Sequence, residues 1–340
     1  MKVCVVGAGA IGGFLAGKLA LAGHDVSVLA RGAHLDAIRR QGLTLVDQHG
    51  KVERAPGVRA EQGSTAGALG EQEVVILALK SHQIAEVAPT LRELLGAATP
   101  VVALQNGLPW WYFHRHGGAF EGRRLESVDP GGRIDRHLPV ARVIGSVAHK
   151  GAEISEPGVV RHIVTPADRF PLGEPDGSRS ARIEAVSDLL QGAGVAAPIT
   201  ADIRTEKWFK LWGNVVWNPV CALTQASVLG VYQTPIAQQL GVTLMLEAQA
   251  VAAKLGVTIP GTPQARLARA LEIGAARPSM LQDTQAGRPL EIDALLGVIV
   301  ELARLTDTPV PSIEAVYSCA KLLDTVITGQ QVRIVSQPLN

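Results

Sequence analysis

The sequence predicts an α/β protein in which an N-terminal doubly wound sheet precedes a C-terminal all-helical domain. Short, unbroken apolar runs, typical of parallel strands covered on both faces, occur only before residue 200. A glycine-rich turn joins the first of these runs to an apolar helical stretch. After Asp202 the strand pattern stops and helical patterns remain. Because 340 residues are many for one hydrophobic core, we expect two domains, at 1–200 and 201–340.

The composition, 47% hydrophobic and 19% charged, is typical of a compact globular protein. The 32 basic and 31 acidic residues leave a net charge of +1. The sequence therefore favours neither a nucleic-acid partner nor a membrane partner. The three cysteines, Cys4, Cys221 and Cys319, lie far apart and lack the spacing of metal ligands. We expect no metal site, and a reducing, cytoplasmic location.

A glycine-rich turn follows the first strand. Residues 2–6 (KVCVV) predict a buried strand, and residues 7–12 (GAGAIG) connect it to a helix that ends near Gly23. In a Rossmann-type domain the first glycine of G-x-G-x-x-G allows a tight turn, the second lets a pyrophosphate approach, and the third lets helix and strand pack closely. The helix N-terminus supplies free N–H groups. The expected cofactor-binding residues here are Gly7, Gly9, Ala10, Ile11 and Gly12. A purely structural turn is the alternative.

The second strand, at about 25–30, lacks the acidic residue that usually holds the ribose 2′-OH of NAD. Ala30 and Arg31 occupy that place. A cation there suits a 2′-phosphate, so the sequence favours NADPH over NADH. An ordinary solvated arginine is the alternative.

Two further apolar strands, at 74–80 and 100–107, end in Lys80 and in Gln105-Asn106-Gly107. The carboxyl ends of parallel strands share one edge of the sheet, where ligands bind. We therefore expect Lys80 and Asn106 to lie near cofactor or substrate. A helix-capping or solvent-facing role is the alternative for each.

Residues 110–142 predict a long irregular excursion. Its aromatic residues at 110–113 directly follow the Asn106 turn, so we expect them at the mouth of the site. A tolerated surface loop is the alternative. Beyond it we expect three short antiparallel strands and one helix. The strands lie at 142–149, 158–164 and 169–173, and the helix at 178–191.

In the second half, cap residues and early prolines predict where helices begin. Three helices are expected to start at Thr234-Pro235, Thr262-Pro263 and Pro311-Ser312. Gly256 and Gly329 are expected to end two of them. A further helix, at 291–305, carries an apolar stripe.

Residues 208–219 (WFKLWGNVVWNP) predict a buried helix that carries one polar stripe. Lys210, Asn214 and Asn218 recur every four residues, and Glu206 would extend the stripe backwards. Buried polar groups need partners. The partner is either a ligand or, in the alternative, Glu206 balances Lys210 inside a structural core.

The chain resembles the ketopantoate reductases (2-dehydropantoate 2-reductases) over nearly its whole length. The K-x3-N-x3-N-P spacing at 210–219 is the most specific part of the resemblance. The other matching segments are GAGAIG at 7–12, Arg31, LKSHQ at 79–83, QNG at 105–107, PSMLQD at 278–283 and EID at 291–293.

The resemblance implies an oxidoreductase of pantothenate and coenzyme A biosynthesis that reduces 2-dehydropantoate to (R)-pantoate. The implied catalytic residues are Lys210 and Glu291. Lys210 would be the general acid that protonates the keto oxygen while NADPH delivers hydride. Asn214 and Asn218 would hold the substrate and the lysine. Ser279 and Glu291 would bind the carboxylate and hydroxyl ends of the substrate. The implied cofactor–substrate junction comprises Asn106, Lys80, Gln83 and Glu291.

Two departures leave the identity of the 2-keto acid open. The excursion at 110–142 is longer than the family pattern, and Ala276-Arg277-Pro278 stands where the family often has an asparagine. The alternatives are a reductase of another 2-keto acid, a β-hydroxyacid or glycerol-phosphate type of dehydrogenase, and an NADP-sensing regulatory protein. The apolar faces of the helical domain also favour a homodimer, without fixing the oligomeric state.

Overall fold

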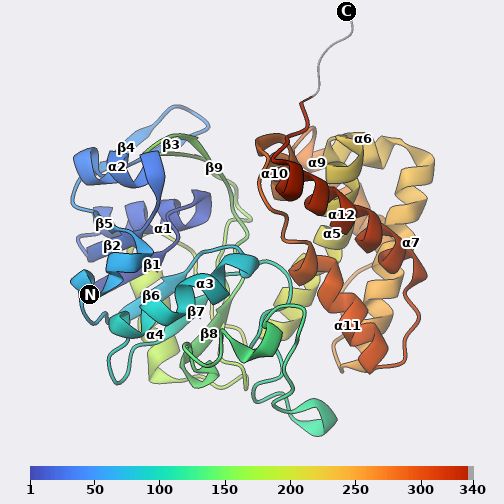
Figure 1. The fold of residues 1–340 in the computed structure, drawn as a ribbon, viewed down its shortest axis with the longest axis horizontal. Helices are drawn as coiled ribbons and strands as arrows, with labels where there is room; N and C mark the ends of the chain where they lie inside the picture. The colour runs from blue at the N-terminus through green and yellow to red at the C-terminus, as the bar shows by residue number, and fades with distance from the viewer. Residues whose placement is uncertain (336–340) are drawn as a thin grey trace, which may run out of the picture. The chain divides into compact units, whose positions relative to one another are not determined.

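The computed structural model describes residues 1–335, which form two compact units (Figure 1). The first unit comprises Met1–Gln105, Pro109–Arg124 and Asp129–Glu206. The second comprises Asn106–Leu108, Leu125–Val128 and the chain from Lys207 onward. Both units are therefore discontinuous in sequence.

The first unit is built on a seven-stranded sheet in the order β11-β8-β7-β6-β1-β2-β5. All neighbours are parallel except the β11–β8 pair. The strands are β1 (Lys2–Val6), β2 (Asp25–Leu29), β5 (Arg59–Glu61), β6 (Val74–Leu77), β7 (Val101–Ala103), β8 (Val143–Ser146) and β11 (Leu172–Gly173). After β1 the chain builds outward first through β2 and later through β6. The carboxyl end of β1 is thus the topological switch point, where open α/β sheets bind ligands.

Four helices of the first unit are long enough to pack on the sheets: α1 (Ala10–Leu21), α2 (Gly32–Gln41), α3 (Ser81–Leu91) and α4 (Ala181–Gly192). Short 3₁₀ segments lie at Gly63–Leu69, Arg92–Leu94, Gly118–Phe120, Pro130–Gly132 and Val140–Arg142. The expected helix at 178–191 is α4, which Ser180 caps by accepting a hydrogen bond from the N–H of Ile183.

A second sheet, in the order β4-β3-β10-β9, also packs on α1. Its strands are β3 (Leu43–Asp47), β4 (Val52–Ala55), β9 (Gly151–Glu156) and β10 (Val159–Ile163). Helix α1 is apolar on most of its circumference because it is covered from both sides. Gly13 and Gly17 allow this, since a Cβ there would press on Val160 and Leu45 of the second sheet.

The expected trio of antiparallel strands is wrong in its pairing. β8 joins the main sheet in parallel with β7, and only β11 runs antiparallel to it. β10 pairs antiparallel with β9 but parallel with β3, which the apolar pattern did not reveal as a strand. Alternating or apolar runs indicate that a strand exists, but its partners are set by tertiary packing.

The described part of the second unit contains helices and no strand, which confirms the predicted all-helical half. α5 (Ile203–Thr224) begins in the first unit and continues in the second. The others are α6 (Val228–Gln233), α7 (Pro235–Lys254), α8 (Pro263–Ala268), α9 (Ala270–Ile273), α10 (Ser279–Ala286), the π-helical turn Asp293–Gly297, α11 (Val298–Leu305) and α12 (Pro311–Gln330). Over residues 1–335, none is long and apolar enough to span a membrane.

The predicted helix starts are confirmed, because prolines 235, 263 and 311 each open a helix. Gly256 follows α7 closely, in the left-handed region (φ 78°). Gly329 does not end its helix. α12 continues through it to Gln330, and Gln331 adopts the left-handed cap conformation instead.

The segment Leu125–Val128 belongs to the second unit because of one carboxylate. Glu301 in α11 accepts hydrogen bonds from the N–H groups of Glu126 and Ser127, both at 2.8 Å. These bonds fix a short stretch of the 110–142 excursion against α11.

The aromatic residues that open the excursion are core residues of the first unit. Trp111, Tyr112 and Phe113 are 0% exposed, and Trp110 is buried. The Trp111 ring covers Gly145 of β8, where a Cβ would collide with it. The expectation that these side chains reach the mouth of the site is therefore wrong. Burial of the aromatic rings fixes the excursion to the sheet.

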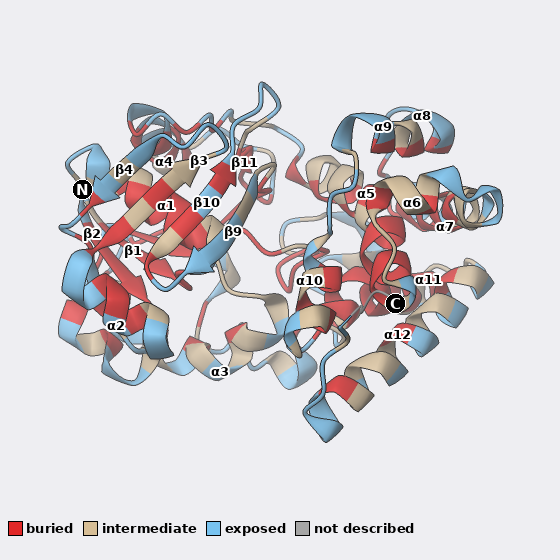
Figure 2. Cartoon of the chain, turned by 90° about the horizontal axis from the view of Figure 1, so that it is seen from above, coloured by how far each residue is buried: buried red, intermediate tan, exposed pale blue. Residues whose placement is uncertain are grey.

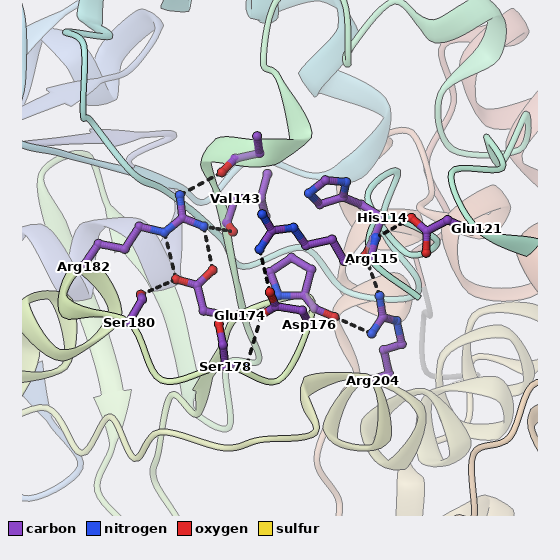
Figure 3. Close-up of polar contacts among 12 residues, drawn as sticks. His114, Arg115, Glu121, Val143, Glu174, Asp176, Ser178, Ser180, Arg182 and Arg204 are labelled. Atoms are coloured by element: carbon purple, nitrogen blue, oxygen red, sulfur yellow. Dashed lines mark hydrogen bonds and ion pairs between the residues drawn. The ribbon is translucent and has the colours of Figure 1, made fainter. Parts of the chain in front are cut away.

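Hydrogen bonds from Arg204 hold this excursion in place (Figure 3). Its Nε donates to the carbonyl of Tyr112 at 2.8 Å, and its Nη2 to that of His114 at 2.7 Å. Its Nη1 donates to the carbonyl of Pro175. A carboxylate, Glu121, accepts from the N–H groups of residues 115 and 117. One partly buried guanidinium thus satisfies three backbone carbonyls.

Replacing this guanidinium should destabilise the first unit. Arg204→Met keeps the apolar stem but leaves buried acceptors unpaired, at about 1–3 kcal/mol for each fully desolvated group. We expect the free energy of unfolding to fall by about 2–4 kcal/mol. The melting temperature Tm, measured by calorimetry, should then fall by roughly 5–15 °C.

The matched control is Arg179→Met, which removes an exposed arginine paired with Glu184. Exposed ion pairs contribute about 0–1 kcal/mol, so its Tm should stay close to that of the parent. Equal Tm values for the two variants would contradict the role given to Arg204.

Candidate active site

The glycine-rich turn forms one end of the candidate site in the first unit. Gly7 has φ +99°, and a Cβ on Gly12 would collide with the carbonyl oxygen of Gly7. Gly9 is exposed, and a Cβ there would meet nothing within 4 Å. Ala10 and Ile11 begin α1, whose first N–H groups have no partner within the helix. The turn therefore leaves open space above free N–H donors, which fits the pyrophosphate of a dinucleotide.

Arg31 lies at the carboxyl end of β2 and directly before α2. Its side chain is exposed, and it forms no ion pair within residues 1–335. β1 and β2 are parallel neighbours in register, with Val6 opposite Leu29. Arg31 and the glycine-rich turn therefore lie at the same edge of the sheet.

Lys80 lies close to the carboxyl end of β6, on the other side of β1. It directly precedes α3, and its N–H donates to the Oε1 atom of Gln83 at 3.3 Å. Gln83 thus has a capping function in addition to any role with a ligand. Gln105 is buried and donates from Nε2 to the Leu77 carbonyl at 2.8 Å, which ties the end of β7 to the end of β6.

Asn106 is placed by the second unit. The next residue, Gly107, has φ +73°, and a Cβ on it would collide with the carbonyl of Ala294 in the π-helical turn. The N–H of Leu108 donates to the same carbonyl at 3.2 Å. This close approach holds half-buried Asn106 in the unit that contains Glu291.

The polar stripe lies on α5 within the second unit. Lys210 and Asn214 are half-buried and Asn218 is 3% exposed. The Ser279 hydroxyl, at the start of α10, donates to the Oδ1 atom of Asn218 at 3.5 Å. Most of the apolar residues that flank the stripe on α5 are buried, and Figure 2 shows buried segments of this helix in red. Two helices of one unit, α5 and α10, therefore carry four of the predicted site residues: Lys210, Asn214, Asn218 and Ser279.

Burial controls the charge of Lys210. It lowers the pKa of the Lys210 ammonium to about 8, while Glu291 raises it and Arg266 lowers it further. Glu291 is 8% exposed and directly precedes the π-helical turn. The Arg266 guanidinium lies 4.6 Å from the centre of the Phe209 ring. An ammonium whose pKa lies near neutrality is well suited to giving up a proton.

Glu206 does not extend the stripe. It belongs to the first unit, where its Oε2 lies 3.5 Å from His149 Nε2 and 3.5 Å from Arg169 Nη2. His149 and Arg169 lower the pKa of Glu206. The carboxylate that acts on Lys210 is Glu291. The expectation failed because a four-residue step drifts by about 40° around a helix, so three steps move Glu206 about 120° away from Asn218.

Sequence reasoning missed Lys207. It is 3% exposed, and burial together with the Lys210 charge lowers its pKa to about 7, while Glu291 raises it. A usable signal was present: Lys207 precedes Asn214 by seven residues, a spacing that returns to almost the same face of a helix. The four-residue spacing of Lys210, Asn214 and Asn218 does not include Lys207, so that pattern alone did not identify it.

Two family models match most of the chain. The model described as ketopantoate reductase PanE/ApbA matches residues 3–114, and the model of the ketopantoate reductase PanE/ApbA C terminal matches residues 202–324. The segment between these matches includes most of the 110–142 excursion.

Relatives of known sequence and structure agree. A 2-dehydropantoate 2-reductase of Mesorhizobium japonicum is 47% identical over 95% of this chain and 98% of its own length. A candidate ketopantoate reductase of Ralstonia solanacearum has a crystal structure with a TM-score of 0.89, 40% identity, and coverage of 96% and 98% of the two chains. The 2-dehydropantoate 2-reductase of Geobacter metallireducens gives a TM-score of 0.81 at 27% identity, covering 95% and 99%.

These matches extend over both units and include the glycine-rich turn and the α5 stripe. The chain therefore belongs to the ketopantoate reductase (2-dehydropantoate 2-reductase) family, whose members are NADPH-dependent oxidoreductases.

Proposed function

We propose that this protein reduces 2-dehydropantoate to pantoate with NADPH, in the cytoplasm. The observation that supports this most is the α5 stripe, a desolvated lysine followed by two asparagines, with the carboxylate of Glu291 acting on the lysine. The close relative of Mesorhizobium japonicum is named for the same reaction. The three cysteines are all free, which suits a reducing compartment.

NADPH binding is assigned to the first unit, within residues 1–200. The open glycine-rich turn would receive the pyrophosphate, and the exposed guanidinium of Arg31 the 2′-phosphate. Lys80 and Gln83, near the end of β6, would contact the cofactor toward the nicotinamide. When bound, NADPH supplies a hydride to the keto carbon of the substrate.

Lys210 is assigned the proton transfer. As the C–H bond forms at the keto carbon, negative charge develops on the keto oxygen, and a fixed ammonium stabilises that charge. Lys210 then gives its proton to the oxygen, which completes the hydroxyl group and leaves a neutral amine that regains a proton from water. Burial makes this release easier by lowering the pKa of the ammonium.

The remaining polar residues of the second unit, within 201–340 and the Asn106 turn, are assigned to substrate. Asn214 and Asn218 would position substrate and lysine, and Ser279 reaches the stripe through its contact with Asn218. Glu291 raises the pKa of Lys210 and so favours its protonated form. Its carboxylate can also accept a hydrogen bond from a substrate hydroxyl. Asn106 would complete the junction with the cofactor.

We further propose that the second unit mediates a homodimer. Its helices expose large apolar side chains, which an interface with a second copy would bury. Among them are Ile236, which is 82% exposed, Leu322 and Leu271. A dimeric ketopantoate reductase of Staphylococcus aureus shares the fold. Light scattering coupled to size-exclusion chromatography measures the oligomeric state directly.

A panel of 2-keto acids followed at the NADPH absorbance tests the proposed function. 2-Dehydropantoate should give the highest kcat/KM. A higher value for another 2-keto acid would change the substrate but not the reaction class. A preference for a β-hydroxyacid or a glycerol phosphate would assign the chain to a different dehydrogenase type, and no turnover at all would favour a cofactor-sensing role.

Removing the proposed acid should slow the chemistry but leave cofactor binding unchanged. For Lys210→Met we expect kcat to fall by about 10²–10⁴-fold, the usual contribution of general acid catalysis, with the Kd of NADPH unchanged. Because the protonated lysine is the active form, kcat/KM of the parent should also decline as the pH rises through about 8. Asn214→Ala is the matched control and should act more on KM than on kcat.

A large drop in Tm with near-normal turnover in Lys210→Met would contradict the catalytic assignment. That result would mean that Lys210 is a structural partner of a buried carboxylate.

Arg31 should decide the preference for NADPH. A charge-assisted hydrogen bond to a phosphate is worth about 1.5–3 kcal/mol, so Arg31→Ala should weaken NADPH binding by about 10- to 150-fold and leave NADH nearly unchanged. Arg40→Ala, an exposed arginine on the same helix α2, is the control and should change neither. Equal losses for both cofactors in Arg31→Ala would refute the assignment.

A further inference from the structure

Asp293, the residue that begins the π-helical turn, is bound by helix α12. The Tyr317 hydroxyl donates to its Oδ1 atom at 2.7 Å, and the Lys321 ammonium donates to its Oδ2 atom at 2.6 Å. Gly297, at the end of the turn, leaves room for the phenol, since a Cβ there would lie 3.1 Å from the Tyr317 hydroxyl oxygen. Burial and the bond to Asp293 raise the pKa of this phenol, while Arg304 lowers it. The phenol therefore remains a donor at neutral pH.

The same helix binds the chain on the other side of Glu291. The Asp324 carboxylate accepts a hydrogen bond from the N–H of Leu290 at 2.8 Å. Residues 317, 321 and 324 lie within about 60° of one another around a helix of 3.6 residues per turn, so they form one polar face of α12. We call these three side chains the α12 clamp. Glu291 lies between its two points of attachment, Leu290 and Asp293.

Helix α12 is itself fixed within the second unit. At its start, the Glu247 carboxylate of α7 accepts hydrogen bonds from the N–H groups of Ser312 at 3.0 Å and Ile313 at 2.9 Å. Along its length, Ile313, Ala320 and Ile327 are buried. The clamp can therefore define the position of the segment that it binds.

Stability alone is a weak reason for the clamp. The side chains of Lys321 and Asp293 are 43% and 40% exposed, and ion pairs this exposed contribute little to stability. The contacts instead fix the chain at Glu291, which is 8% exposed and raises the pKa of both Lys207 and Lys210. Because the interaction of two charges weakens with distance, the position of Glu291 determines how strongly it acts on these lysines.

We propose that the α12 clamp is a positioning device for the reaction, because it holds Glu291 where its carboxylate acts on Lys210. The proposal rests on the proposed function, in which Lys210 is the proton donor. Each side chain of the clamp acts through Glu291 and is given no contact with substrate or cofactor. The charged groups that act on Lys210 are Glu291 and Arg266, and Lys210 and Glu291 act in turn on Lys207.

Deleting the Tyr317 hydroxyl should move the pH profile of the reaction. Glu291 raises the pKa of Lys210, so its displacement lowers that pKa, and the protonated lysine is the active form. For Tyr317→Phe we expect kcat/KM to decline at a pH about 0.5–1 unit lower than in the parent, part of the roughly 1–3 units that a nearby opposite charge supplies. The matched control is Ser318→Ala, which deletes a hydroxyl that donates to the Glu314 carbonyl of the same helix. Its profile should match that of the parent.

Asp324 offers a rescue that separates position from charge. Asp324→Ala should move the profile in the same direction as Tyr317→Phe. Asp324→Asn keeps an acceptor oxygen for the N–H of Leu290 and should restore the profile of the parent. If Asp324→Asn moves the profile as far as Asp324→Ala, the lost charge acts directly and the positioning role is overturned.

A double-mutant cycle tests whether the clamp acts through Glu291. Adding Tyr317→Phe to Glu291→Gln should produce no further shift of the profile, because the carboxylate that the clamp positions is already gone. An equal shift in both backgrounds would overturn the proposal. A lower Tm of Tyr317→Phe with the pH profile of the parent would also overturn it, since the clamp would then serve the fold alone.

A direct measurement of the Lys210 pKa needs no turnover. NMR titration of protein that contains isotope-labelled lysine gives this pKa, which is about 8 in the parent, and Lys210→Met assigns the signal by its loss. The pKa should be lower in Tyr317→Phe, and an equal pKa in the two proteins would overturn the proposal. If the parent reduces no 2-keto acid, the proposed function fails, and the titration still decides whether the clamp holds Glu291 against Lys210.

Discussion

The burial of two lysine amines on one helix, where the Glu291 carboxylate acts on both, is the constraint on which the second unit depends. Moving an ammonium out of water is costly, and burial accordingly lowers the pKa values of Lys207 and Lys210. The apolar flanks of α5, including Trp208 and Trp212, keep water away from these amines. That desolvation gives Lys210 its acidity, so the packing of the helix and the proposed chemistry have the same cause.

The first unit depends on a different constraint, which is the open space around its glycine-rich turn. Its glycine-rich turn has glycines where side chains would collide, at Gly7 and Gly12, and one where a side chain would occupy empty space, at Gly9. Gly107 also lacks a side chain where a Cβ would collide, and this lets the Asn106 turn approach the backbone of Ala294. Close approach of backbone thus places both the N–H donors of the glycine-rich turn and the side chain of Asn106.

Local patterns predicted much of this molecule. The glycine-rich turn, the helix starts at prolines 235, 263 and 311, and the stripe at 210–218 are visible because each is set by neighbours within a few turns. The second sheet and the burial of Trp111 depend on partners far away in sequence, which no local period reveals. Glu206 and Lys207 show the limit most clearly: adjacent residues on one helix, they belong to different units and face different charges.

The discontinuity of the two units has a consequence for biosynthesis and for engineering. The chain passes from one unit to the other after residues 105, 108, 124, 128 and 206. On the ribosome, the stretches at 106–108 and 125–128 emerge long before α11 and the π-helical turn that hold them. The nascent first unit must therefore carry two unsatisfied insertions until synthesis is nearly complete. A gene cut near residue 200 would separate each insertion from its binding partner, so neither fragment would contain a whole folding unit.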